Sequence, residues 1–236
     1  MALHKIRLLL SGALVFACAC ASGEWHESLR QQHLDARGGH AALESLQVIE
    51  RTGTITFHEL SPEVSGTYHT CIHYPTRVVI DIDAGPVQVH QVRGDSGALE
   101  CGPGFDTCAV AHEDVAEQLE VTAQEANREE LRENIPKDAV IEPIRRDERI
   151  VGYRYEIDGE LIEKEYSPES RLLLRTRKGP RERRYSNWRD VGGLLMPMLI
   201  KDLVDGKRAV TVELSSATHD VTPGKWCRTR FASRST

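Results

Sequence analysis

Apolar and polar residues alternate with a period of two along most of this chain. In residues 51–57, for example, Ile55 and Phe57 alternate with threonines, which is the pattern of a strand with one buried face. Asp158-Gly159 separates two such runs and is typical of a two-residue hairpin turn. The pattern therefore predicts an antiparallel β-sheet. Its expected strands are residues 51–57, 66–74, 78–82, 87–89, 140–144, 150–157, 161–166, 172–177, 182–188, 198–204 and 209–217. A further strand is expected between a turn at residues 94–97 and Cys101.

The period changes to that of a helix in three places. Residues 24–37 and 40–46 carry apolar residues at helical spacing, with two glycines between them. Residues 112–133 are predicted to form an amphipathic helix that is rich in glutamate. Neither a repeat nor an obvious linker interrupts the pattern, so we expect one α+β domain over residues 22–236.

The first residues have the order of a secretory signal peptide. Lys5 and Arg7 precede an apolar run from Leu8 to Ala17 that ends in small residues. A helix that spans a membrane needs about 20 apolar residues, and this run is shorter. We therefore expect residues 1–21 to be a signal peptide and the mature chain to work in the periplasm.

Two ways of processing the leader are open. Residues 19–21 (Ala-Cys-Ala) fit the small-x-small pattern of signal peptidase, whose cleavage after residue 21 would release a soluble protein. Residues 15–18 (Val-Phe-Ala-Cys) instead resemble a degenerate lipobox, in which Cys18 would be lipidated. The first route predicts a soluble periplasmic protein, and the second predicts a lipoprotein anchored to the outer membrane.

Four cysteines follow the leader, and an even number in an oxidising compartment favours disulfides over free thiols. Cys101 and Cys108 flank a Gly-Pro-Gly turn that would bring their sulfur atoms together. That pair leaves Cys71 with Cys227, a bridge that would tie the C-terminal tail to an early strand.

The charge of the chain argues against a nucleic-acid partner. The formal net charge is −6 with both signs interspersed, whereas binding to phosphates requires a concentrated basic surface. One basic cluster is open to two interpretations: the solvated face of a hairpin, or a docking surface for anionic lipid headgroups or an acidic partner. Its members are Arg175, Arg177, Lys178, Arg181, Arg183 and Arg184.

Histidines suggest a metal site as one alternative. His69, Cys71 and His73 alternate, so their side chains would share one face of a strand, where His58 or His90 of a neighbouring strand could join them. A Cys71 held in a disulfide could not be a ligand, which favours ordinary polar residues on the outer face of the sheet. No hydrolase motif and no phosphate-binding glycine loop is present, so we expect a protein without enzymatic activity or a cofactor.

Two stretches resemble the outer-membrane lipoprotein carrier superfamily (LolA/LolB-like). Residues 34–53 are similar to the helix, double glycine, short helix and first strand that open these proteins. Residues 185–198, followed by 205–212, are similar to their hairpin, in which glycine and proline lead into a strand ending in Asp-Gly. The resemblance implies a strongly curved antiparallel sheet, a half-barrel, with helices covering its concave face.

A fold of this kind would bind an apolar ligand on its concave face, and we expect its partners to be acyl chains of a lipid or lipoprotein. The alternatives are an apolar face filled by its own helices, and an envelope-sensing module on the same scaffold that contacts a partner protein. We expect a monomer with peripheral or lipid-anchored membrane association. The candidate ligand-binding residues are Ile55, Phe57, Tyr68, Ile72, Val78, Ile80, Ile82, Val87 and Val89.

Overall fold

The computed structural model describes residues 24–74, 77–94, 97–105, 107–116, 119, 135, 136 and 138–219. Its helices are α1 (Glu24–Ala36), α2 (His40–Ser45) and the 3-10 helix η1 (Pro103–Phe105). Its strands are β1 (Val48–Phe57), β2 (Val64–His73), β3 (Arg77–Ala84), β4 (Val87–Gly94), β5 (Gly97–Cys101), β6 (Cys108–Val110), β7 (Glu142–Arg146), β8 (Arg149–Ile157), β9 (Glu160–Tyr166), β10 (Leu173–Lys178), β11 (Arg181–Val191), β12 (Leu194–Val204) and β13 (Lys207–His219).

Several predictions from the sequence lie outside these residues. They are the signal peptide over residues 1–21, the lipidation candidate Cys18 and the C-terminal Cys227. Of the predicted helix 112–133, residues 113–116 are helical, and most of the remainder is not described. Among the described residues, no helix has the length and apolar character needed to cross a membrane.

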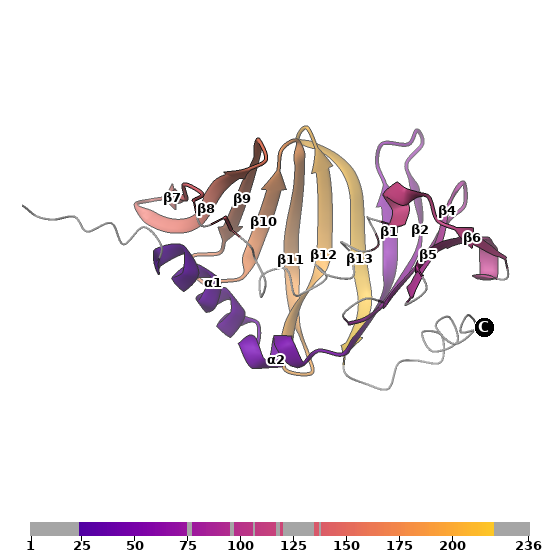
Figure 1. Ribbon diagram of the computed structural model, residues 1–236, viewed down its shortest axis with the longest axis horizontal. Coiled ribbons are helices and arrows are strands. Elements are labelled where there is room, and N and C mark those ends of the chain that lie inside the picture. The colour runs from indigo at the N-terminus through magenta and orange to yellow at the C-terminus, as the bar shows by residue number, and fades with distance from the viewer. Residues whose placement is uncertain are drawn as a thin grey trace, which may run out of the picture.

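The strands form one antiparallel sheet of 13 strands, which confirms the predicted α+β fold with a curved antiparallel sheet. Its spatial order is β6-β5-β4-β3-β2-β1-β13-β12-β11-β10-β9-β8-β7. Neighbours in space are neighbours along the chain except at one place, where β1 pairs with β13. Figure 1 shows the strands side by side in a bent sheet, with α1 and α2 lying across one end of it. We call the face toward these helices the concave face and the opposite face the convex face.

The hairpin predicted at Asp158-Gly159 is present between β8 and β9. Ile157 pairs with Glu160, and the two turn residues have φ values of 52° and 78°. Both values lie in the left-handed region that a type I′ turn requires, and glycine adopts it without steric cost. One strand is displaced from its prediction: residues 140–144 were expected, and β7 is Glu142–Arg146, because this edge strand is mostly polar and alternates weakly.

The two helices supply the core at one end of the concave face. Leu34 of α1, Leu43 of α2 and the adjoining Leu46 are fully buried. They pack with Leu194 and Met196 of β12 in one cluster. Burial of each such side chain contributes roughly 1.5–3 kcal/mol. The helices are therefore attached to the sheet by their apolar side chains, although α2 is only one and a half turns long.

The junction between α1 and α2 fits closely against the hairpin that joins β11 to β12. Gly38 has a φ of 123°, and a Cβ atom at this position would lie 2.6 Å from the carbonyl oxygen of Gly193. The neighbouring Arg37 accepts a backbone hydrogen bond from Leu195 at 3.0 Å. The double glycine noted in the sequence is therefore the point where the helical segment meets the backbone of the sheet.

Helix α1 rests on an aromatic cluster at the β8–β11 side of the sheet. Tyr153, Tyr155 and Tyr166 are buried there, with Trp25 and Trp188 packed beside them. The guanidinium of the buried Arg37 lies 5.7 Å from the ring centroid of Trp188, a cation–π contact. This cluster completes the core beneath α1.

Candidate functional site

The pairing register places most of the predicted ligand-binding residues on the concave face. Tyr68 of β2 pairs with Ile82 of β3, and Ile82 pairs with Val89 of β4. Across the β1–β13 junction, Ile55 pairs with Val212. Strands that are adjacent in the sheet show paired residues on the same face, so these side chains form one continuous apolar surface.

Six of the nine predicted residues belong to one apolar cluster on this face, which we call the concave cluster. Its members from β12 and β13 were missed by the sequence analysis, although both strands were predicted, because the β1–β13 contact is not visible in a local pattern. The buried members are Ile55, Ile82, Met198, Val212 and Leu214, and the partly buried members are Phe57, Tyr68, Ile80, Val89, Ile200, Val210 and Ala217.

The other three predicted residues lie elsewhere. Ile72 and Val78 are buried in the core cluster under the helices, with exposed fractions of 2% and 0%. For Ile72 and Val78 the alternative interpretation is correct, because the protein's own helices cover the apolar face there. Val87 is half-buried at the start of β4, where it pairs with Ala84. The apolar residues of the concave face therefore form two groups. The helices α1 and α2 cover the core cluster, and they leave the concave cluster uncovered.

Much of the concave cluster retains accessible apolar surface. Ile55, Met198 and Leu214 form a buried floor, whereas Phe57 and Ile200 are only partly buried. Partial burial of several neighbouring apolar side chains leaves a surface that another apolar group can cover. The end of the concave face away from α1 and α2 is therefore the candidate ligand site.

An ion pair lies beside the concave cluster. Arg183 of β11 donates two hydrogen bonds to Asp202 of β12, from Nε to Oδ1 at 2.6 Å and from Nη2 to Oδ2 at 2.9 Å. Asp202 follows Ile200 at the next position on the same face of β12. Partial desolvation by neighbouring groups lowers the pKa of the half-exposed Arg183, but the hydrogen bond and charge of Asp202 outweigh that effect and raise it. The guanidinium is therefore held in its charged form.

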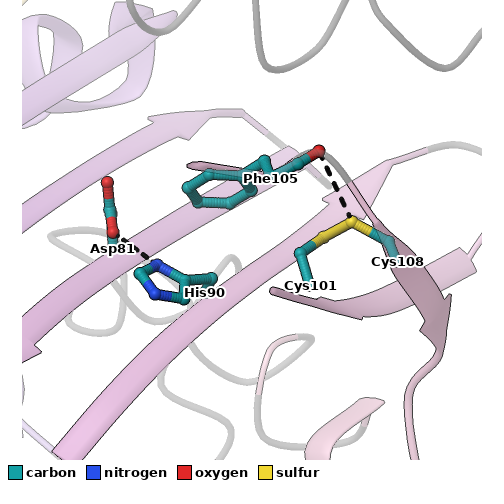
Figure 2. Close-up of a disulfide and its surroundings, with 5 residues drawn as sticks. All are labelled: Asp81, His90, Cys101, Phe105 and Cys108. Atoms are coloured by element: carbon teal, nitrogen blue, oxygen red, sulfur yellow. Dashed lines mark hydrogen bonds and ion pairs between the residues drawn. A yellow bond between two sulfur atoms is a disulfide. The ribbon is translucent and has the colours of Figure 1, made fainter. Parts of the chain in front are cut away.

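The cysteine tip predicted between residues 101 and 108 closes over the convex face. Cys101 and Cys108 form a disulfide, and Phe105 of the loop between them packs on Val79 and Val92. Figure 2 shows the ring of Phe105 beside His90, whose Nδ1 lies 2.7 Å from Asp81. The tip thereby covers a small apolar cluster of its own.

Cys71 belongs to the same convex cluster and is fully buried and disulfide-bonded. Its expected partner, Cys227, lies outside the described residues, so the pairing of these two cysteines stays a prediction. A cysteine held in a disulfide offers no thiolate to a metal ion.

The histidines considered for a metal site are distributed over separate contacts. His58 lies 2.9 Å from Glu63, His69 lies 2.9 Å from Glu50, and His90 contacts Asp81 as described. Within the described part of the chain, no group of three or more histidine, cysteine or acidic side chains is arranged to hold a metal ion. The geometry gives no support to the metal-binding alternative there.

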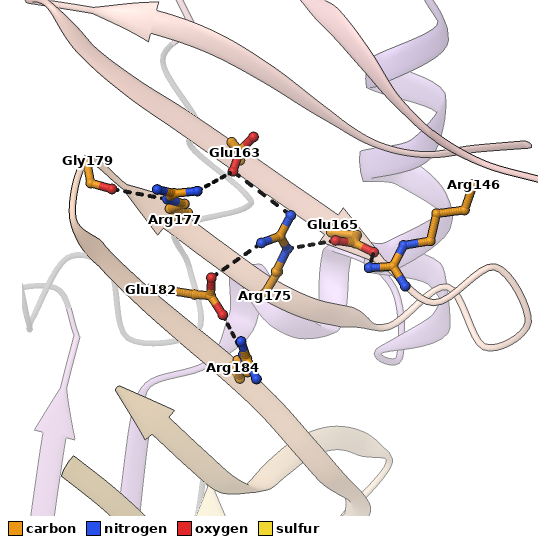
Figure 3. A network of polar contacts seen from close by, with 8 residues as sticks. All are labelled: Arg146, Glu163, Glu165, Arg175, Arg177, Gly179, Glu182 and Arg184. Atoms are coloured by element: carbon orange, nitrogen blue, oxygen red, sulfur yellow. Dashed lines mark hydrogen bonds and ion pairs between the residues drawn. The ribbon is translucent and has the colours of Figure 1, made fainter. Parts of the chain in front are cut away.

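The basic cluster over residues 175–184 is divided between the two faces of the sheet, which corrects its interpretation as one surface. Figure 3 shows Arg175, Arg177 and Arg184 in a network with three glutamates, and Arg175 alone contacts all three. Burial lowers the pKa of Arg175, but its hydrogen bond to Glu165 and the nearby carboxylates raise it above the ordinary value. The glutamates are Glu163, Glu165 and Glu182.

Acidic side chains thus neutralise most of the positive charge that the sequence suggested. Glu165 is almost fully buried and also pairs with Arg146 of β7, which ties the edge strand to the network. Arg183, by contrast, points to the concave face through its pairing with Asp202. A free basic docking surface is therefore not formed by these residues.

Known structures share this architecture. No protein-family model and no curated protein sequence matches the chain. A domain named for outer membrane lipoprotein sorting, from Vibrio parahaemolyticus, superposes with a TM-score of 0.53 at 6% identity, over 86% of this chain and 95% of that one. A DUF1329 family protein from Desulfovibrio piger gives 0.53 at 8% identity, over 84% and 94%.

A LolA superfamily protein from Nitrosomonas europaea is also similar, with a TM-score of 0.48 at 11% identity, over 84% of this chain and 94% of that one. At identities this low, the similarity shows only that the fold is shared. In this chain, the opening that was singled out in the sequence is present as α1, Gly38-Gly39, α2 and β1, and the late hairpin is present in β11–β13. This chain has a LolA-like fold, a curved antiparallel sheet that it shares with the Vibrio and Desulfovibrio structures.

Proposed function

We propose that this protein is a non-enzymatic envelope protein that binds an acyl chain of a lipid or lipoprotein on its concave face. The observation that carries the proposal is the concave cluster, whose buried floor is bordered by partly buried apolar side chains at the end of the sheet that α1 and α2 leave uncovered. The name of the Vibrio structure, a lipoprotein-sorting domain, adds support from a protein of the same fold.

The energetics of such a site favour a ligand with a long alkyl chain. Each methylene removed from water contributes about 0.8 kcal/mol. Burial of about ten methylenes would therefore contribute about 8 kcal/mol, which is comparable with the estimated 4–15 kcal/mol that association costs in lost freedom of motion. A longer alkyl chain is accordingly the class of ligand that can bind by contact with this surface alone.

The predicted leader and the cysteines support a periplasmic location. The predicted signal peptide, the disulfide at Cys101–Cys108 and the disulfide-bonded Cys71 are all in keeping with an oxidising compartment. In this proposal residues 22–236 work as one unit, either soluble or attached to the outer membrane through Cys18.

The proposal is tested by lipid content and by a pair of matched variants. Native mass spectrometry of the protein purified from its own envelope is expected to show a bound lipid. Ile200→Gln, on the concave face, should weaken uptake of a fluorescent fatty acid about tenfold, because it places an amide among apolar side chains.

Leu199→Gln provides the control, since Leu199 is the adjacent, equally half-buried residue whose side chain points to the convex face. We expect its lipid uptake to match that of the wild type. Protein that carries no lipid and takes up none, or equal losses in the two variants, would contradict binding at this face.

A further inference from the structure

We propose that Arg183 anchors the oxyanion head of a single-chain amphiphile whose alkyl chain lies along the concave cluster. This inference rests on the proposed function and specifies its ligand class: an alkyl chain that ends in a carboxylate or phosphate. The basis is the position of the Arg183–Asp202 ion pair at one end of the apolar surface.

The alternation of β12 sets the geometry of the site. Met196, Met198, Ile200 and Asp202 occupy successive positions on the concave face, which leads from the helix-covered end toward the β12–β13 turn. A strand rises about 3.3 Å per residue, so about 13 Å separate Met198 from Asp202. A ligand lying along this row would have its apolar chain over Ile200 and the other partly buried members of the concave cluster, with Met198 beneath them, and its head beside the ion pair.

Arg183 keeps hydrogen-bonding capacity for a second partner. A guanidinium has five N–H donors, and Asp202 accepts from two of them. The side chain of Arg183 is 52% exposed and that of Asp202 is 33% exposed, so the pair is reachable from solvent. A planar guanidinium edge matches the geometry of carboxylate and phosphate oxygens.

The same sheet shows that one arginine can hold several carboxylates. On the convex face, Arg175 contacts Glu163, Glu165 and Glu182 at once (Figure 3). Arg183 is a comparable guanidinium one strand away, and Asp202 is its carboxylate partner within the described part of the chain. A second oxyanion at Arg183 would reproduce an arrangement that this protein already uses.

Tyrosine hydroxyls also belong to this face. Tyr185 lies two residues from Arg183 on the same face of β11, where it pairs with Ile200, and Tyr68 of β2 is a member of the concave cluster. Lys164 of β9 lies on the same face by register, but its side chain is buried. The polar groups that a ligand head would meet are therefore those of the Arg183–Asp202 pair, whereas its chain would meet apolar side chains.

The test compares three ligands with the same twelve-carbon chain: dodecanoate, dodecyl phosphate and dodecan-1-ol. Isothermal titration calorimetry of the wild-type protein should show that at least one of the two anions binds about tenfold tighter than the alcohol, as a charge-assisted hydrogen bond predicts. The two anions decide between carboxylate and phosphate.

Two substitutions should act in opposite directions. Arg183→Gln is expected to remove the tenfold preference for the anions while the affinity for dodecan-1-ol stays unchanged. Asp202→Asn should instead strengthen binding of the anions, because it removes the competing negative charge. Unchanged affinity for dodecan-1-ol in both variants would show that the fold is intact. With the fold intact, weaker binding of the anions to Asp202→Asn, or a full anion preference in Arg183→Gln, would overturn the proposal.

Arg184→Gln is the matched control, since Arg184 is the neighbouring arginine on the convex face, where it pairs with Glu182. Its binding profile should be that of the wild type. Equal affinity of the wild type for anions and alcohol would overturn the role of Arg183 and leave acyl-chain binding intact. Failure of all three ligands to bind would instead refute the proposed function itself.

Discussion

Arg183 and Arg184 are adjacent in the sequence, and their side chains lie on opposite faces of the sheet. Side chains of successive strand residues point in opposite directions, so Arg183 contacts Asp202 on the concave face and Arg184 contacts Glu182 on the convex face. The alternation itself is readable from the sequence. The partner Asp202 is not, because its position opposite Arg183 depends on the register that the β11–β12 turn sets.

At the residue scale, Gly38→Ala should lower the free energy of unfolding by about 2 kcal/mol or more, as strain at a positive φ combined with a close contact predicts. A Cβ atom there would lie 2.6 Å from the Gly193 oxygen and 2.7 Å from Leu194 Cδ2. Urea denaturation measures the change.

The control for that substitution is Gly94→Ala, because no atom lies within 4 Å of a Cβ at Gly94. We expect a change within about 0.5 kcal/mol, as for most surface substitutions. If the Gly38→Ala protein were as stable as the control, the contact between the helical segment and the hairpin would contribute nothing to the free energy of unfolding.

Strands and hairpins were largely predictable, because each depends on a local alternation and on turn residues such as Asp158-Gly159. The tip between Cys101 and Cys108 was predictable as a loop, but not the place where it packs. Phe105 reaches across the convex face to Val79 and Val92, a contact that no local pattern specifies. The long helix expected over 112–133 remains a prediction for most of its length.

At the element scale, replacing both Cys101 and Cys108 with serine should lower the free energy of unfolding by about 2 kcal/mol, the chain-entropy effect of opening a short loop. The two cysteines are separated by 7 positions. Chemical denaturation followed by tryptophan fluorescence measures the loss.

The corresponding double alanine variant separates loss of the bond from the polarity of serine, and it should show a similar loss. If both variants were as stable as the wild type, the tip would contribute nothing to the fold beyond covering its apolar cluster.

In the whole molecule, β1 and β13 join the two ends of the described chain at the centre of the sheet. The register from Ile49↔His219 to Phe57↔Val210 connects residues that are more than 150 positions apart. Contacts this distant in sequence leave no local signal, which is why the β12 and β13 half of the concave cluster was not foreseen. The curved sheet was foreseen only through the resemblance to a known fold.

This central pairing predicts cooperative unfolding. Because the early and late strands share one sheet and the concave cluster, residues 22–236 should unfold in a single transition in differential scanning calorimetry, with equal calorimetric and van't Hoff enthalpies. Two resolved transitions would show that the halves on either side of the β1–β13 pair are independent units.

Among the described residues, the sheet ends at β6 on one side and at β7 on the other, and these two strands do not pair with each other. An open sheet differs from a closed one in how a ligand can enter. Under the proposed function, an alkyl chain would bind this face sideways along its whole length and would not have to thread through a closed end. Its carbon atoms would then leave water together during binding.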